Sequence, residues 1–114
     1  MIIPSAENAV VDIRKLLDYV LNPKHERGKH KARVFASVFG LTASDAAAFR
    51  EYLLQIVKTE EAQLGMRGNY GQIYWIDLPL TWNDVTENIR TTWIVRHDED
   101  FPRLVSCFVR RRGR

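Results

Sequence analysis

The sequence predicts an α+β domain, with three N-terminal helices packed on one face of an antiparallel, three- to four-stranded C-terminal meander. Two observations support this fold class. Up to about residue 62 the apolar residues recur with the helical period, whereas from residue 72 they alternate with polar residues. The later segments are also rich in β-branched and aromatic residues, which favour strands. Since strands that follow one another through short loops pair as neighbours, the preceding helices are expected to cover one face.

The first elements are a short strand and a helix. Residues 8–11, "NAVV", are typical of a strand, and Asp12 is a good N-cap for a helix over 13–21. Apolar residues of this helix share one face, namely Ile13, Leu16, Leu17 and Val20. Asn22-Pro23 ends the helix, because the residue before a proline is pushed out of the α region. A polar loop over 24–28 follows.

Two further helices are expected before the strands. The second runs from about Lys29 to Phe39, with Gly40 as its C-cap. Thr42 or Ser44 caps a third helix that extends to about residue 62. Its apolar stripe consists of Ala46, Phe49, Leu53, Ile56 and Val57. The segment "GMRGNYG" (65–71) has three glycines in seven residues and is interpreted as a flexible loop.

Three strands are predicted over 72–80, 87–95 and 102–109. "TWND" (81–84) connects the first two, and 96–102 connects the second to the third. We expect no domain boundary within this part, so residues 1–109 form a single α+β domain. Residues 110–114 form a basic C-terminal tail.

Composition excludes several classes of protein. The chain has 114 residues, 46% of them hydrophobic and 27% charged, as in ordinary soluble domains. No apolar run approaches the roughly 20 residues that span a bilayer, and the N-terminus does not resemble a signal peptide. We therefore expect a cytoplasmic protein without membrane contact. A single cysteine, Cys107, excludes an internal disulfide and a cysteine-based zinc site, and its strand pattern predicts a buried thiol.

The positive charges are segregated along the chain. The arginines of the tail account for more than the net charge of +3, so the remaining residues are slightly acidic. Within them, residues 24–33 are strongly basic and residues 77–100 are acidic. Basic patches are commonly solvated surfaces, and the functional alternative is a polyanion, above all nucleic acid.

The second helix begins with a candidate phosphate site. Lys31 lies on the same helical face as the apolar residues Val34, Phe35, Val38 and Phe39, which must pack against the sheet. Its ammonium group therefore either extends past the core edge or meets an anion held between helix and sheet. The helix start adds free backbone N–H groups and a positive dipole beside His25, Gly28 and Lys29, an arrangement that suits a phosphate.

Alternation within the strands divides their polar residues between two faces. In the middle strand Thr91 and Trp93 point one way and Arg90 the other. In the last strand Ser106 is in phase with Leu104 and Phe108. A guanidinium on a central strand needs an anionic partner, and for Arg90 the sequence leaves open a structural carboxylate such as Asp77 or a bound phosphate.

Most of the aromatic residues are interpreted as core, namely Trp75, Trp93, Tyr74 and Phe108. Stacking on an unpaired base is the alternative, and Trp82 suits it best because we expect it in a loop. The three histidines have no metal-ligand spacing, and motifs for nucleophilic serine, phosphate loops and dinucleotides are missing. We therefore expect neither a metal nor a cofactor.

Several blocks resemble a small bacterial family of unassigned function, namely "YVLNPKHERGKHKARVF", "FGLT", "YGQIYWID", "RTTWIV" and "PRLVSCFV". Its pattern is LNPxHxxGxxKAxxF, then YG, RTxW and PRLV(T/S). The resemblance covers about residues 8–109. Members of that family occur alone or at the C-terminus of large secreted toxins. Their layout is similar to that of barnase, EndoU, the colicin tRNases and RelE, ribonucleases that work without metal.

The residues of the family pattern that are present in this sequence, and that the resemblance implies to be functional, are His25, Gly28, Lys31, Arg90, Thr91 and Trp93. The resemblance also has two notable departures. Ser106 stands where threonine is usual and keeps the hydroxyl, whereas Glu26 stands where proline is usual and puts a carboxylate beside the candidate phosphate site.

The leading hypothesis is a metal-independent endoribonuclease that acts by attack of the ribose 2′-OH and leaves a cyclic phosphate. It extends to the toxin of a toxin–antitoxin pair, with a small antitoxin as partner. His25 is the expected general acid or base, Lys31 and Arg90 neutralise the phosphorane, and Thr91 and Ser106 bind phosphate oxygens. The expected RNA-binding residues are Gly28, Lys29, His30, Trp82 and Trp93. Arg90 and Thr91 face opposite sides of an ideal strand, so one site can use both only near a bulge or strand edge.

The alternative is a non-catalytic interaction module. Its basic loop and arginine tail bind RNA or an acidic protein, while Lys31 and Arg90 form internal ion pairs. The sequence also leaves a homodimer open.

Overall fold

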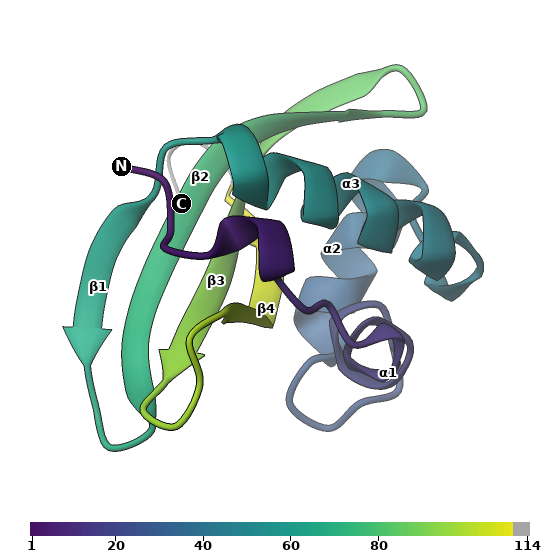
Figure 1. The fold of residues 1–114 in the computed structure, drawn as a ribbon. Coiled ribbons are helices and arrows are strands. Elements are labelled where there is room, and N and C mark those ends of the chain that lie inside the picture. Colours follow the sequence, from purple (N-terminus) through teal and green to yellow (C-terminus); the bar gives the residue numbers. More distant parts are fainter. Residues whose placement is uncertain (111–114) are drawn as a thin grey trace.

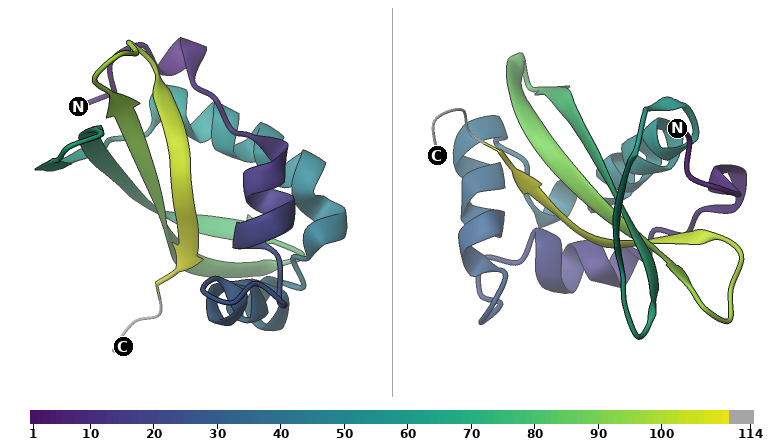
Figure 2. Two further views of the ribbon diagram at one scale, coloured as in Figure 1. Left: turned by 90° about the horizontal axis from the view of Figure 1, so that it is seen from below. Right: turned by 90° about the vertical axis from the view of Figure 1, so that its left-hand side faces the viewer.

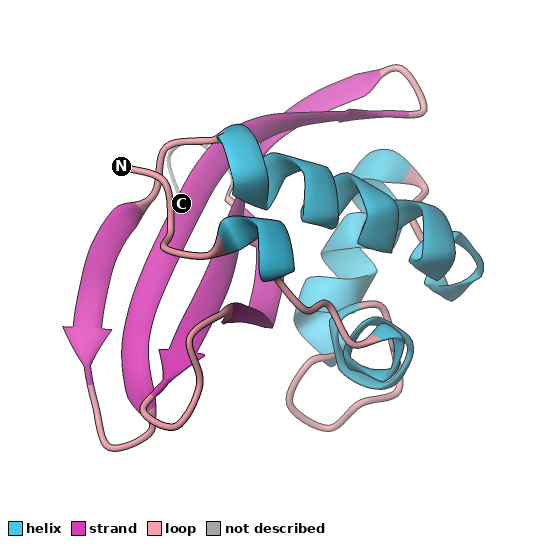
Figure 3. Cartoon of the chain, viewed as in Figure 1, coloured by secondary structure: helices cyan, strands magenta, loops and turns pink. Residues whose placement is uncertain are grey.

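The computed structural model describes residues 1–110, so the expected basic tail lies, from residue 111 on, outside the described residues. The helical segments are η1 (Ala6–Asn8), α1 (Ile13–Lys15), η2 (Leu16–Val20), α2 (Lys29–Phe39), η3 (Ala43–Asp45) and α3 (Ala46–Thr59). The strands are β1 (Gln63–Arg67), β2 (Gly71–Trp82), β3 (Val85–Arg96) and β4 (Pro102–Val109). Figure 1 shows their arrangement, and Figure 3 shows helices and strands in separate layers.

The four strands form one antiparallel sheet in the order β1-β2-β3-β4, and the helices lie on one of its faces. The predicted α+β meander is therefore confirmed. The face toward the helices is called the inner face below, and the opposite one the outer face. Two views in Figure 2 show that the strands twist strongly and that α2 lies beyond the β4 edge of the sheet. No helix within residues 1–110 combines the length and apolar character needed to cross a membrane.

Local capping chemistry sets the helix ends, as predicted. The Asp12 side chain accepts a hydrogen bond from the Arg14 backbone N–H at 2.9 Å, which starts α1. After Lys15 the hydrogen bonds of this helix widen to the π pattern, and the segment ends at Leu21, before Asn22-Pro23. Gly40 ends α2 with a positive φ of 66°, a conformation that glycine adopts without steric cost.

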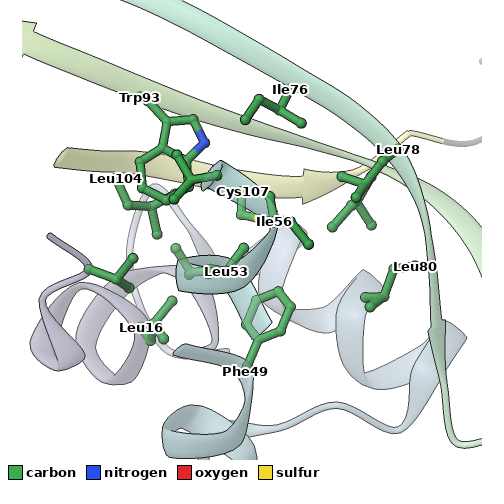
Figure 4. Packing of buried hydrophobic residues seen from close by; sticks show 14 of the residues in the cluster. Leu16, Phe49, Leu53, Ile56, Ile76, Leu78, Leu80, Trp93, Leu104 and Cys107 are labelled. Carbon is green, nitrogen blue, oxygen red and sulfur yellow. The ribbon is translucent and has the colours of Figure 1, made fainter. Parts of the chain in front are cut away.

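The third helix also begins and packs as expected. Thr42 and Asp45 form a capping box, in which the Thr42 backbone N–H donates to the Asp45 carboxylate at 3.0 Å. One turn of 3₁₀ helix then leads into α3. Its whole predicted stripe is buried, namely Ala46, Phe49, Leu53, Ile56 and Val57. Together with Trp93, Leu104 and Leu16 these side chains form the interior between helices and sheet (Figure 4).

Three local predictions were wrong. Residues 65–67 of the expected glycine loop belong to the edge strand β1 (Gln63–Arg67), which pairs with β2. At the N-terminus residues 6–8 form a 3₁₀ turn, and only Val10 makes a bridge, with Arg103 of β4. Trp82 belongs to β2, so the connection to β3 consists of Asn83 and Asp84 alone, which have φ angles of 50° and 64°.

A bulge in β4 changes the predicted phase of that strand. Leu104 pairs with Trp93, but Ser106 pairs with Thr92, so Val105 is an extra residue in the ladder. Leu104 and Cys107 therefore lie on the inner face and are buried. Ser106 and Phe108 lie on the outer face, which corrects the expectation that Ser106 shares a face with Leu104. The prediction of a buried Cys107 is confirmed.

Candidate functional site

Arg90 has a carboxylate partner on the outer face. Its Nε and Nη2 donate to the two carboxylate oxygens of Asp77 at 2.8 and 2.9 Å, and its guanidinium lies 5.0 Å from the centre of the Trp75 ring. Arg110 Nη1 donates to the same carboxylate at 2.6 Å. The hydrogen bonds from Arg90 hold the pKa of the Asp77 carboxyl below its usual range. Of the two partners that the sequence left open for Arg90, the structure contains the carboxylate.

Thr91 and Trp93 are interior residues. Both side chains are fully buried. The Thr91 hydroxyl donates to the backbone carbonyl of Ile76 at 3.2 Å and accepts from Trp93 Nε1 at 2.8 Å. Each polar group thus has its partner inside the core, where an unpaired one would be costly. The expectation that Arg90 and Thr91 serve one site is corrected, because they lie on opposite faces of the sheet and neither Thr91 nor Trp93 reaches a surface.

His25 organises the loop before α2. Its Nδ1 accepts hydrogen bonds from the backbone N–H groups of Arg27 and Gly28 at 3.0 and 2.9 Å, and its carbonyl accepts from the Lys29 N–H. Because Nδ1 is an acceptor, the neutral ring carries its proton on Nε2, and Nε2–H remains available to a ligand. Gly28 is required by space, since a Cβ there would lie 2.8 Å from the Tyr19 carbonyl oxygen.

The start of α2 differs from the expected phosphate cradle. His25 already accepts the N–H groups of Gly28 and Lys29, so these are not free for an anion. Lys29 is half-buried and His30 is exposed. Lys31 does point toward the sheet, as predicted, and its Nζ lies 5.0 Å from the centre of the Phe108 ring at the β4 edge. The structure thus places this cation against an aromatic face.

His25 and Ser106 line one hollow at the surface, although 81 positions separate them in the chain. The hollow has a volume of about 680 Å³. Its walls come from α1 and η2, from the loop before α2, and from the bulge of β4. The lining residues are Lys15, Tyr19, His25, Glu26, Arg27, Val105 and Ser106. We call this the loop hollow. Its lining residues include a histidine, two cations, one carboxylate and two hydroxyl-bearing residues, which are groups that can hold a phosphate and move its protons.

The structure brings together only part of the predicted site. Of the five expected catalytic residues, His25 and Ser106 share the loop hollow, whereas Lys31 is not among its lining residues and lies against Phe108. The expected stacking residue Trp82 packs edge-on against Phe49, with ring centres 5.8 Å apart. It is thus part of the core boundary rather than a loop platform.

Sequence reasoning missed Lys15, Tyr19 and Arg27 as neighbours of His25. Lys15 and Tyr19 lie on the polar side of the first helix, and no local pattern marks them. They reach the hollow only because that helix packs beside β4. Within residues 1–110 no cluster of three His, Cys, Asp or Glu side chains is arranged to hold a metal ion.

Comparison with known proteins identifies the family. Residues 2–111 match the family described as "Domain of unknown function (DUF6883)", and the chain belongs to this family. No curated protein sequence matches the chain. Among solved structures, the fold is similar to a chain of the "Contact-dependent growth inhibition toxin - immunity protein complex from Klebsiella pneumoniae 342", at a TM-score of 0.68 and 16% identity. The similarity covers 95% of this chain and 97% of that one. It establishes a shared fold.

Proposed function

We propose that this protein is an RNA-cleaving toxin module of a bacterial growth-inhibition system, acting through the 2′-OH without a metal ion. One observation carries the proposal: His25, Lys15, Arg27 and Ser106 converge on the loop hollow from segments far apart in sequence. Such convergence of cations, a hydroxyl and a histidine at an open surface suits a phosphodiester that enters from solvent.

In this proposal the polar groups of the loop hollow have separate roles. Lys15 and Arg27 neutralise the charge that develops on the phosphorane, while His25 Nε2–H and the Ser106 hydroxyl donate to its oxygens. Glu26 supplies the one carboxylate among the described lining residues and takes the proton of the 2′-OH. The 2′-oxygen then bonds to phosphorus, and the P–O5′ bond breaks. The departing 5′-oxygen takes a proton from water on the open side.

This role of His25 differs from the acid or base role that the sequence predicted. Protonation of Nδ1 would remove the acceptor of the Arg27 and Gly28 N–H groups and would disrupt the loop. The proposal therefore uses the neutral ring as a donor. The likeness to a chain of a toxin–immunity complex supports a growth-inhibition role and a protein partner.

The test is cleavage of total RNA in the presence of EDTA. His25→Asn is the informative variant, because an asparagine oxygen can accept the same backbone N–H groups while Nε2–H is lost. We expect His25→Asn and Glu26→Gln to cut at least about 100-fold more slowly than wild type. Arg33→Ala, which removes an exposed cation of α2 outside the hollow, is the control and should cut normally. Equal cutting by His25→Asn and wild type contradicts the proposal.

A second candidate is a non-catalytic module that binds RNA or an acidic protein. The Arg90–Asp77 pair favours it, because this hypothesis expected Arg90 to form an internal ion pair. Lys31, for which it expected the same, instead lies over the Phe108 ring. On this reading wild type binds RNA with a strong salt dependence but does not cut it. Truncation after residue 109 should then weaken binding and reduce the salt dependence, whereas His25→Asn should change nothing.

A further inference from the structure

A second hollow adjoins the loop hollow. It has a volume of about 820 Å³ and shares Lys15 and Val105 with its neighbour, so the two hollows meet at these residues beside β4. Its far end is formed by the β1–β2 turn, with Asn69 and Tyr70, and by the end of β3, with Arg96 and the following His97. We call it the turn hollow. A ligand held in the loop hollow can therefore extend into the turn hollow without leaving the surface.

Tyr70 is an exposed aromatic residue on an anchored turn. Its side chain is 80% exposed, the largest fraction among the exposed apolar and aromatic residues described. Its backbone is nevertheless fixed, because the Tyr70 carbonyl accepts from the His97 N–H at 3.1 Å. His97 Nε2 and the Gly68 carbonyl are also 2.9 Å apart. The ring is thus open to solvent on a fixed stretch of backbone, so a flat ligand can stack on it without ordering the turn.

The charges of the turn hollow favour a neutral ring over a second phosphate. Lys15, Arg96 and Arg103 share the walls of this hollow with the carboxylates of Asp12 and Asp98. Arg103 is further neutralised by Glu99, with hydrogen bonds of 2.8 Å from Nε and Nη2. Apolar side chains complete the lining, among them Ile94, Leu104 and Val105. An apolar wall, an aromatic plane and nearly balanced charge are the surroundings that an unpaired nucleobase prefers.

We propose that the turn hollow binds the nucleobase next to the phosphate held in the loop hollow, with Tyr70 stacking on it. The ligand is thus single-stranded RNA that lies along β4. This inference rests on the proposed function for its placement of the phosphate. Because stacking is tolerant of base identity, the Asn69 amide is the group that can discriminate between bases by hydrogen bonding to their edges.

The test measures binding of a fluorescent 2′-O-methyl hexanucleotide, which cannot be cut, and of the same oligomer with abasic residues. Tyr70→Ala should weaken binding of the intact oligomer about tenfold and leave binding of the abasic one unchanged. Tyr70→Phe, which keeps the ring, should bind within about twofold of wild type. Unchanged thermal unfolding of both variants verifies the fold.

Two results overturn this inference: intact oligomer binding that is insensitive to Tyr70→Ala, or an equal loss for intact and abasic oligomers. The cleavage assay separates the two proposals. If wild type cuts RNA but binds it independently of Tyr70, only the base-binding role of the turn hollow is overturned. Binding that depends on Tyr70 without any cutting overturns only the ribonuclease and supports a base-stacking surface.

Discussion

The Arg90 guanidinium and the Asp77 carboxylate form a bidentate ion pair on the outer face of the sheet, at N–O distances of 2.8 and 2.9 Å. The two residues are direct cross-strand neighbours of β3 and β2, and each side chain is only about a quarter exposed, at 23% and 24%. Such a pair holds the register of the two central strands and occupies an arginine that the sequence alone offered to a phosphate.

Asp77→Asn tests this pair through the pH dependence of stability. Arg90 lowers the pKa of the Asp77 carboxyl in the folded state. The pair therefore stabilises the fold fully above the pKa of Asp77 in the unfolded chain, about 3.9, and this stabilisation is lost as the pH falls through the lower pKa of the folded state. We expect Asp77→Asn to lose about 1–2 kcal/mol of unfolding free energy at pH 7. Urea denaturation should show that the unfolding free energy of wild type decreases more steeply with falling pH than that of the variant. The exposed Arg14–Asp18 pair gives the control, since Asp18→Asn should change stability by less than about 0.5 kcal/mol.

Thr91→Val should destabilise the protein without affecting RNA cleavage by the folded molecules. The substitution leaves Trp93 Nε1–H without an acceptor in the core, which costs about 1–3 kcal/mol. Thr91→Ser keeps the hydroxyl and should retain more of the stability. Denaturant unfolding measures both changes. A Thr91→Val protein that is fully folded but has lost cleavage would show that Thr91 acts in the chemistry after all.

The Asn83-Asp84 turn should respond in opposite directions to two substitutions. Both residues have positive φ, as in the type I′ hairpin turn, for which Asn-Gly is the preferred pair. Asp84→Gly should therefore raise the melting temperature, by the equivalent of about 0.4–1 kcal/mol. Asn83→Ala should lower it, because Asn83 Nδ2 donates to the Phe39 carbonyl at 2.8 Å and ties the hairpin to the end of α2. Thermal unfolding followed by circular dichroism measures both melting temperatures. Shifts of both in the same direction would contradict this account.

Cys107 should not react with thiol reagents in the native protein. Its side chain is fully buried, and burial raises the pKa of the thiol far above that of a free cysteine. Labelling with a disulfide reagent at pH 8 should therefore require unfolding and should accelerate with urea in parallel with the loss of structure. Denatured protein should label at once. Rapid labelling in native buffer would indicate that β4 opens locally beside α2.

Elements with local signals were predictable from the sequence. The α2 helix was predicted with its observed bounds, because Gly40 supplies a C-cap that needs no tertiary information. The three long strands were found because their alternation reflects one buried face. β1 was missed for the same physical reason: its Leu64 and Met66 are 63% and 74% exposed, so burial leaves no pattern in this edge strand.

The candidate site was only partly predictable, because it depends on contacts between distant segments. His25 was identified from its place in the basic loop, but its double hydrogen bond to the Arg27 and Gly28 N–H groups is a property of the folded loop. Its neighbours Lys15 and Tyr19, from α1 and η2, depend on the packing of these segments beside β4. Alternation assigned the face of Ser106 incorrectly, since a bulge changes phase without any mark in the sequence.

The extra residue at Val105 has a consequence for how this family can vary. If a relative lacks this extra residue, every later side chain of the last strand must move to the opposite face of the sheet. The position of Cys107 would then face outward and that of Ser106 inward. An insertion or deletion in this strand should therefore be accompanied by changes between polar and apolar residues at the positions that follow it. Relatives that keep the bulge should keep a hydroxyl on the outer face. A sequence alignment that places a gap at the wrong position in this strand will therefore match residues from opposite faces of the sheet.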